Sequence, residues 1–148
     1  MTLVKDEDLI LLTAKGMGIK FNSMEISATS RATSGVKGIT LNEDDYVVSA
    51  LPIRNPEDKL AIFVENGVGK KVDLKELITQ KRAGKGLICY KTSDITGLVA
   101  SAALVSDEDK VLICGKTNSI CISASEVPLL SRASIGNQIL KGSKIVSV

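Results

Sequence analysis

The sequence of 148 residues contains no histidine and no tryptophan, and aromatic residues make up only 3% of it. Without histidine, the chain lacks the commonest general base and the commonest neutral metal ligand. Its three cysteines, Cys89, Cys114 and Cys121, form no C-x-x-C pair, which argues against a zinc site or a disulfide framework. Catalysis would have to depend on carboxylates, and we expect free thiols in a reducing cytoplasm.

Long apolar runs are also missing. No stretch of about 18 residues is apolar throughout and no signal-peptide pattern is present, so the sequence predicts neither a membrane span nor secretion. Hydrophobic residues make up 44% of the chain and charged residues 24%, which is typical of a globular domain with a real core. We expect a cytoplasmic protein with no membrane partner.

The net charge of +2 conceals an uneven distribution of charge. Acidic residues cluster at 6–8, 43–45, 57–58 and 107–109. Between these clusters the chain is basic: residues 67–91 hold seven Lys or Arg against two Asp or Glu, and residues 110–144 hold five against one. A modest total can therefore accompany a strongly basic face, which is a property of proteins that bind nucleic acid.

Identical residues recur at a fixed spacing along the chain. Glu25, Glu76 and Glu126 are separated by 51 and 50 residues. Each glutamate is followed by an arginine after six residues and a glycine after ten, namely Arg31, Arg82 and Arg132, then Gly35, Gly86 and Gly136. Such a period indicates a repeat architecture. We divide the chain into units at approximately 6–56, 57–106 and 107–148.

Each unit is predicted to consist of strands. A short apolar run opens each unit, a turn follows and a second strand returns, a pattern that favours buried strands. The turn Asn66-Gly67 is a strong hairpin signal. The expected strands are 8–12, 18–21, 36–41, 46–50, 58–64, 68–72, 86–90, 97–103, 109–113, 119–122, 138–140 and 144–148. The predicted fold class is therefore all-β, an array of three blades of about 50 residues.

One segment could instead be helical, because Val72 to Arg82 carries a weak helical stripe of apolar residues. The equivalent place in the third unit contains Pro128, which a helix interior does not tolerate. We therefore predict an extended crossing segment in all three units.

The middle unit carries the densest basic motif. Its residues Gly67–Lys71, Glu76 and Gln80–Gly86 resemble a blade of the C-terminal domain of the bacterial DNA gyrase A and topoisomerase IV A subunits. The stretches 30–48 and 131–136 look like further blades of that domain. The resemblance covers essentially the whole chain, which looks like the last three blades. The middle unit departs from the family pattern at two positions: Ala83 replaces the first glycine of the basic box, and Val68 stands where an aromatic residue is common. The third unit has Ile135 and Asn137-Gln138 where a basic residue is usual.

This resemblance implies a β-pinwheel, a propeller-like disc whose blades exchange a strand with their neighbours. Three units would form part of a larger disc or a short pinwheel, and open blade edges would favour self-association. The implied function is sequence-independent binding, bending and wrapping of duplex DNA on a basic rim. The implied parent is an ATP-dependent type IIA topoisomerase in the bacterial nucleoid, and the fragment itself would not be an enzyme.

The resemblance also implies partners and cofactors. The implied partners are duplex DNA, the ATPase subunit of the topoisomerase, and the N-terminal breakage-reunion domain that precedes this domain in the same polypeptide. No cofactor or metal site is expected in this fragment, since ATP and Mg²⁺ would be used elsewhere in the parent enzyme.

Candidate DNA contacts follow from charge and from the glycines that allow close backbone approach. They are Arg31, Lys37, Lys70, Lys71, Gln80, Lys81, Arg82, Gly84, Lys85, Gly86, Arg132 and Lys141. The recurring arginines could instead pair with Glu25, Glu76 and Glu126 as an internal brace. We interpret Tyr46 and Tyr90 as packing residues. A protein-binding propeller scaffold is the alternative function, although such a scaffold has no need of the basic box.

Overall fold

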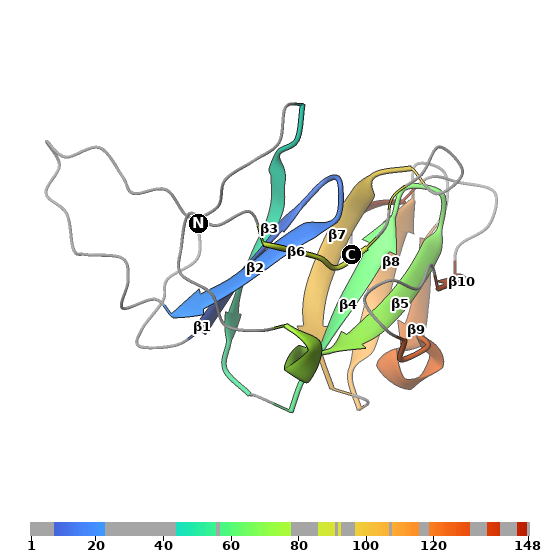
Figure 1. Cartoon of the computed structure of the whole chain (residues 1–148). Coiled ribbons are helices and arrows are strands. Elements are labelled where there is room, and N and C mark those ends of the chain that lie inside the picture. Colours follow the sequence, from blue (N-terminus) through green and yellow to red (C-terminus); the bar gives the residue numbers. More distant parts are fainter. Residues whose placement is uncertain are drawn as a thin grey trace, which may run out of the picture.

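The computed structural model describes residues 8–22, 44–55, 57–77, 86–90, 92, 97–106, 108–115, 119–130, 136–139 and 145–147. Within these ranges the chain is almost entirely β-structure (Figure 1). The strands are β1 (Asp8–Thr13), β2 (Met17–Asn22), β3 (Val47–Ile53), β4 (Lys59–Val64), β5 (Val68–Asp73), β6 (Leu87–Ile88), β7 (Val99–Val105), β8 (Lys110–Gly115), β9 (Ser119–Ser123), β10 (Asn137–Gln138) and β11 (Ile145–Ser147). None of the helices in these ranges is long and apolar enough to cross a membrane.

The strands form three antiparallel sheets, one for each predicted unit. Their orders are β3-β1-β2-β6 in the first sheet, β10-β5-β4-β7 in the second and β11-β8-β9 in the third. The first two sheets each take their outermost strand from the following unit, since β6 belongs to the second unit and β10 to the third. This exchange confirms the expected all-β, pinwheel-like architecture.

Each sheet is built on two consecutive antiparallel strands, β1–β2, β4–β5 or β8–β9. In the first two hairpins the turn glycines, Gly16 and Gly67, have φ values of 88° and 91°, a conformation that glycine adopts without strain. The carbonyl oxygens of these same glycines accept hydrogen bonds from the exchanged segments, from Cys89 N–H at 2.8 Å and from Ile139 N–H at 2.7 Å. In both sheets the glycine that forms the hairpin turn therefore also binds the segment that arrives from the following unit.

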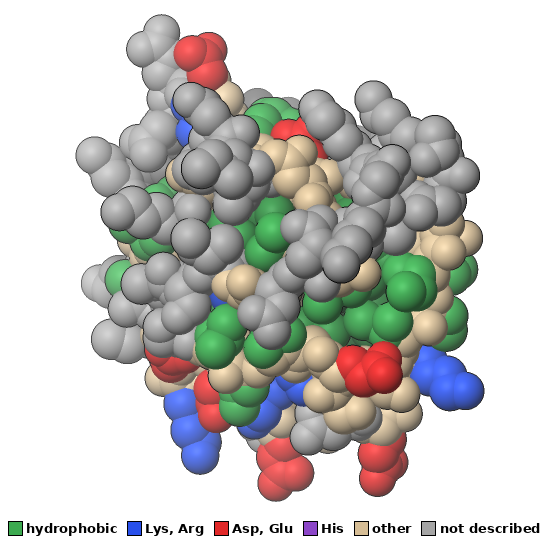
Figure 2. Space-filling model, turned by 90° about the vertical axis from the view of Figure 1, so that its right-hand side faces the viewer, with side chains coloured by type: hydrophobic (Ala, Val, Ile, Leu, Met, Phe, Trp, Pro, Cys, Tyr) green, Lys and Arg blue, Asp and Glu red, His purple; other side chains and the backbone are tan. Residues whose placement is uncertain are grey.

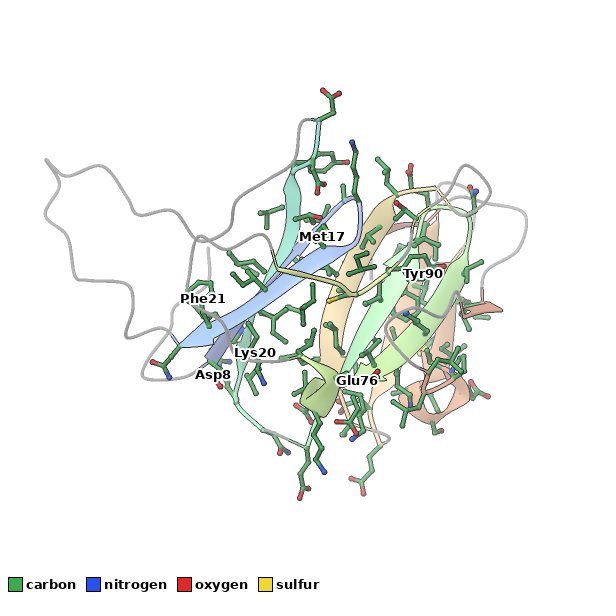
Figure 3. All side chains as sticks on the ribbon, in the orientation of Figure 1. Asp8, Met17, Lys20, Phe21, Glu76 and Tyr90 are labelled. Carbon is green, nitrogen blue, oxygen red and sulfur yellow. The ribbon has the colours of Figure 1, made fainter. Side chains whose placement is uncertain are left out.

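The core lies between the sheets. Successive side chains of a strand point to opposite faces, as Lys20 and Phe21 do on β2 (Figure 3). The first sheet packs on the second through fully buried residues that include Ile10, Leu12, Leu60, Ile62 and Val72. The second sheet packs on the third through a cluster that includes Ala61, Phe63, Val111, Ile113 and Val127. Each sheet therefore depends on its neighbour for burial of one apolar face.

Two glycines of the repeat mark the points where a strand joins the preceding sheet. Gly86 has φ +80° and Gly136 has φ +100°, and a Cβ atom on them would overlap the carbonyl oxygens of Gly18 and Gly69 respectively. Both the backbone conformation and the close approach therefore require glycine. The recurring glycine, ten residues after the recurring glutamate, is thus the residue at which the chain reaches the preceding sheet.

The crossing segments are not extended throughout, contrary to the sequence prediction. They begin with single 3₁₀ turns, η2 (Leu74–Glu76) and η3 (Ala124–Glu126). Pro128 follows the second turn rather than lying inside it, so it is compatible with this local helix. In η3, the Glu126 carboxylate accepts a hydrogen bond from Ser123 N–H at 3.2 Å as part of a capping box. This contact gives the recurring glutamate a local structural role.

We predict that Gly86→Ala lowers the free energy of unfolding by at least about 2 kcal/mol, because alanine strains a positive φ and its methyl group meets the Gly18 carbonyl. Urea unfolding followed by circular dichroism measures the change. The control is Ile88→Ala, since Ile88 lies two residues further on, in β6, with 50% of its surface exposed and should lose less than about 1 kcal/mol. Equal losses in the two variants would contradict the role assigned to the glycine.

Candidate nucleic-acid interface

Three of the predicted DNA contacts lie within the described residues, namely Lys70, Lys71 and Gly86. The other nine, Arg31, Lys37, Gln80, Lys81, Arg82, Gly84, Lys85, Arg132 and Lys141, lie outside them. Their contacts with DNA stay a prediction. The alternative, an internal brace that pairs Arg31, Arg82 and Arg132 with the recurring glutamates, also depends on arginines outside the described residues and stays a prediction.

The described residues on either side of the basic segments show where the chain leaves one sheet and where it reaches the preceding one. The chain leaves the second sheet after Leu77 and is next described at Gly86, against Gly18 of the first sheet. In the third unit it leaves after Leu130, whose N–H donates to the Lys71 carbonyl at 2.9 Å. It is next described at Gly136, against Gly69 of the second sheet. Residues 78–85 and 131–135 therefore make equivalent connections from one blade to the edge of the preceding blade.

These connections end on the outer edges of the sheets. The strands β3, β7 and β11 contact one another in turn, so the three sheets converge along this side. In the first two sheets, β6 and β10 occupy the opposite edge from β3 and β7. The exchanged strands thus lie on the periphery, which is the part of a disc that a curved duplex could follow.

Lys70 and Lys71 are buried, with exposed fractions of 0% and 4%. The Lys70 ammonium lies 5.0 Å from the centroid of the Tyr90 ring, a distance at which a cation and an aromatic face attract one another. Lys71 belongs to the edge of β5 that pairs with residues 128–130. A phosphate contact would require either side chain to leave this position, so the structure gives both lysines a packing role beside the predicted one.

Tyr90 is fully buried, as the sequence predicted, between β6 and the second sheet (Figure 3). Burial raises the pKa of its phenol from 10.0 to about 12, and no hydrogen-bond partner for the hydroxyl is present in the described part of the chain. The same prediction was wrong for Tyr46, which is 53% exposed. Tyr46 precedes β3 and lines an open groove with Val47 and Val99 instead of entering the core.

The ends of the sheets at the joins between units carry mixed charge. Lys59 Nζ lies 3.5 Å from Asp73 Oδ2. The Asp73 carboxylate also accepts a hydrogen bond from Lys75 N–H at 3.0 Å, and this bond, more than the Lys59 charge, lowers the pKa of Asp73. Side chains of both signs gather along this lower border (Figure 2). Among the described residues no group of acidic residues or cysteines could hold a metal ion.

The repeated exchange of strands between sheets matches a known family. A family model described as "DNA gyrase C-terminal domain, beta-propeller" matches residues 7–54, 58–106 and 121–148. The chain belongs to the DNA gyrase C-terminal domain family. The third matched range begins at residue 121, whereas the third unit predicted from the sequence begins at 107, so the unit boundaries stay a prediction.

Relatives and solved structures agree with this assignment. The chain is 35% identical to the DNA gyrase A protein of Lawsonia intracellularis over 142 residues, which are 94% of this chain and 17% of that protein. For the DNA gyrase A protein of Borreliella burgdorferi the identity is 36%, again over 17% of that protein. The structure of a DNA gyrase A C-terminal domain matches with a TM-score of 0.87 at 33% identity, over 98% of this chain and 51% of that one. The fold also matches the C-terminal domain of DNA topoisomerase IV, with a TM-score of 0.90 at 23% identity, over 95% of this chain and 45% of that one.

Sequence reasoning missed two features of this gyrase-type domain. Gly18 and Gly69 also recur, 51 residues apart, and a Cβ on Gly18 would lie 2.5 Å from Cys89 Sγ. Their spacing could have identified them as sites where another strand approaches. The burial of Lys70 had no sequence signal, because an isolated lysine in a strand is usually exposed.

We predict that Tyr90→Phe raises the free energy of unfolding by about 1 kcal/mol at neutral pH, because it removes a buried hydroxyl without a partner and keeps the ring beneath Lys70. Because folding raises this pKa, ionisation of the phenol leaves wild-type stability unchanged below pH 10.0 and lowers it as the pH rises toward about 12. The Phe variant should lack this alkaline component. Chemical unfolding at a series of pH values tests both points, and Tyr90→Leu, which loses the aromatic face, should destabilise. A less stable Phe variant would contradict this account.

Proposed function

We propose that this chain is a DNA-wrapping module of gyrase A type, which binds duplex DNA on its periphery without reading base sequence. The observation that carries the proposal is the position of the exchanged strands β6 and β10 on the outer edges of the first two sheets. Two equivalent segments, 78–85 and 131–135, each join a blade to the outer edge of the preceding one. The first of these connections holds the richest concentration of positive charge in the sequence.

Phosphate neutralisation supplies the binding free energy in this mechanism, because lysine and arginine release counterions condensed on the duplex. The proposed contacts are Arg31, Lys37, Lys81, Arg82, Lys85, Arg132 and Lys141, with Gln80 bracing the loop and Gly84 allowing backbone N–H groups to approach phosphate oxygens. Bending a site of 20–30 base pairs costs roughly 1–6 kcal/mol. Several blades must act together to offset that cost.

The relatives support a larger parent enzyme for this module. They are gyrase A proteins, and the chain spans 17% of the length of those described above. We propose that the parent is an ATP-dependent type IIA topoisomerase of the bacterial cytoplasm, in which this module presents a DNA segment for strand passage. The breakage-reunion domain and the ATPase subunit would then be its partners, and cleavage, ATP and Mg²⁺ would belong to those parts.

The test compares two triple variants of equal charge change. Lys81, Arg82 and Lys85 are replaced by alanine in one variant, and Lys59, Lys75 and Lys110 in the other. The second set lies at the mixed-charge joins, where Lys59 pairs with Asp73. Binding to a linear duplex of roughly 40 base pairs is measured against salt concentration. We expect wild-type binding to be independent of sequence, and the slope of log K against log salt to fall by about 2–3 in the first variant only.

Two results would contradict the proposal. If wild-type protein does not bind the duplex at low salt, this chain is not a DNA-binding module. If both triple variants change the slope equally, net charge rather than the peripheral segment determines binding. A DNA circularisation assay then separates bending from simple adhesion, because only bending increases the closure rate of short duplexes.

A further inference from the structure

Lys70 is a buried cation at a position where the other two sheets have isoleucine. By strand register, Lys70 on β5 corresponds to Ile19 on β2 and to Ile120 on β9. Its side chain is fully buried. Replacing a buried charge by an apolar side chain of similar volume often leaves stability unchanged or raises it. Stability of the core therefore does not explain why this sheet has a lysine here, which indicates a further role for it.

Lys70 lies where the segments that carry both exchanged strands meet the second sheet. Its cross-strand partner Ile62 belongs to the core between the first two sheets, so the Lys70 side chain faces the first sheet. There its ammonium lies 5.0 Å from the centroid of the Tyr90 ring, in the segment that follows β6. Lys70 also lies beside Gly136, where a Cβ atom would be 3.1 Å from the Lys70 Cβ. One side chain thus contacts the arrival points of two successive units.

Tyr90 is itself attached to the first sheet. Its N–H donates to the Gly16 carbonyl at 3.1 Å, and a Cβ atom on Gly16 would overlap the Tyr90 carbonyl oxygen. Its ring is buried in the core between the first two sheets (Figure 3). The basic connection 78–85 leaves the second sheet after Leu77 and reaches the first sheet at Gly86, four residues before Tyr90. The contact between Lys70 and Tyr90 therefore joins the two sheets between which this connection runs.

We propose that Lys70 is a positioning residue for DNA bending, because its contact with Tyr90 fixes the first blade's outer strand relative to the second blade. This inference rests on the proposed function, in which a bent duplex must meet cations of successive blades at the same time. At the next junction Ile120 and Leu140 occupy the equivalent positions. The repeat thus places the cation and the aromatic ring beside the connection 78–85, which carries the most positive charge. The role differs from a phosphate contact, since the ammonium stays in the core.

The test compares Lys70→Ile with Lys75→Ile, which removes the same charge from an exposed position. Circularisation of a duplex of roughly 150 base pairs should slow at least about threefold in Lys70→Ile and stay at the wild-type rate in Lys75→Ile. The slope of log K against log salt should be unchanged in both, whereas loss of a phosphate contact would lower it by about 0.9. Urea unfolding should show Lys70→Ile to be at least as stable as the wild type, which separates positioning from loss of the fold.

Variants of the ring test the same contact from its other side. Tyr90→Phe keeps the aromatic face and should circularise DNA at the wild-type rate, whereas Tyr90→Leu should be as slow as Lys70→Ile. The double variant of Lys70→Ile and Tyr90→Leu should be no slower than either single variant, because both remove one contact. Lys70→Met, which is unbranched and uncharged, should behave as Lys70→Ile and provides the comparison if isoleucine prevents folding.

The outcomes separate this inference from the proposed function. If the wild type bends the duplex and the Lys70 variants bend it equally well, the positioning role is wrong and the proposed function stands. A fall in the salt slope for Lys70→Ile, or additive losses in the double variant, would also overturn the positioning role. If the wild type neither binds nor bends the duplex at low salt, the proposed function fails and this inference fails with it.

Discussion

The structure depends on one close approach of main chain to main chain. At Gly86 and Gly136 the chain arrives at the edge of the preceding sheet with a positive φ, so near to Gly18 and Gly69 that no Cβ atom fits. The hydrogen bonds from Cys89 and Ile139 to the turn glycines then hold the arriving segment. Without this approach the sheets would share only their apolar faces. With it, a strand of the following unit pairs with each of the first two sheets and completes it.

The same constraint links fold to function. A strand that crosses to the outer edge of the preceding sheet needs a connection that ends at the periphery, and this connection is where the sequence places its basic residues. The recurring arginines are therefore spaced along the sequence by the blade repeat. Charges of both signs lie at the joins, where Asp73 pairs with Lys59. The proposed division into a DNA-facing rim and mixed-charge ends is a consequence of where the exchange occurs.

Much of the fold could be predicted because its determinants are local and repeated. The apolar runs and Asn66-Gly67 indicated the hairpins, and the recurring glycine at Gly86 and Gly136 marked an important position. The prediction failed where non-local packing or local caps decided the outcome. The 3₁₀ turns depend on caps formed by Asp73 and Glu126, and Tyr46 is exposed because its position precedes β3 at the open end of a groove.

The sequence by itself determined the number of units, their strand content and the location of the basic segments, because these follow from periodicity and composition. Only the tertiary structure decided which strand completes which sheet, since β6 and β10 pair with residues some 70 positions earlier in the chain. It also decided that Lys70 enters the core with its ammonium over the Tyr90 ring. Burial depends on what lies across from a residue, and no local pattern contains that information.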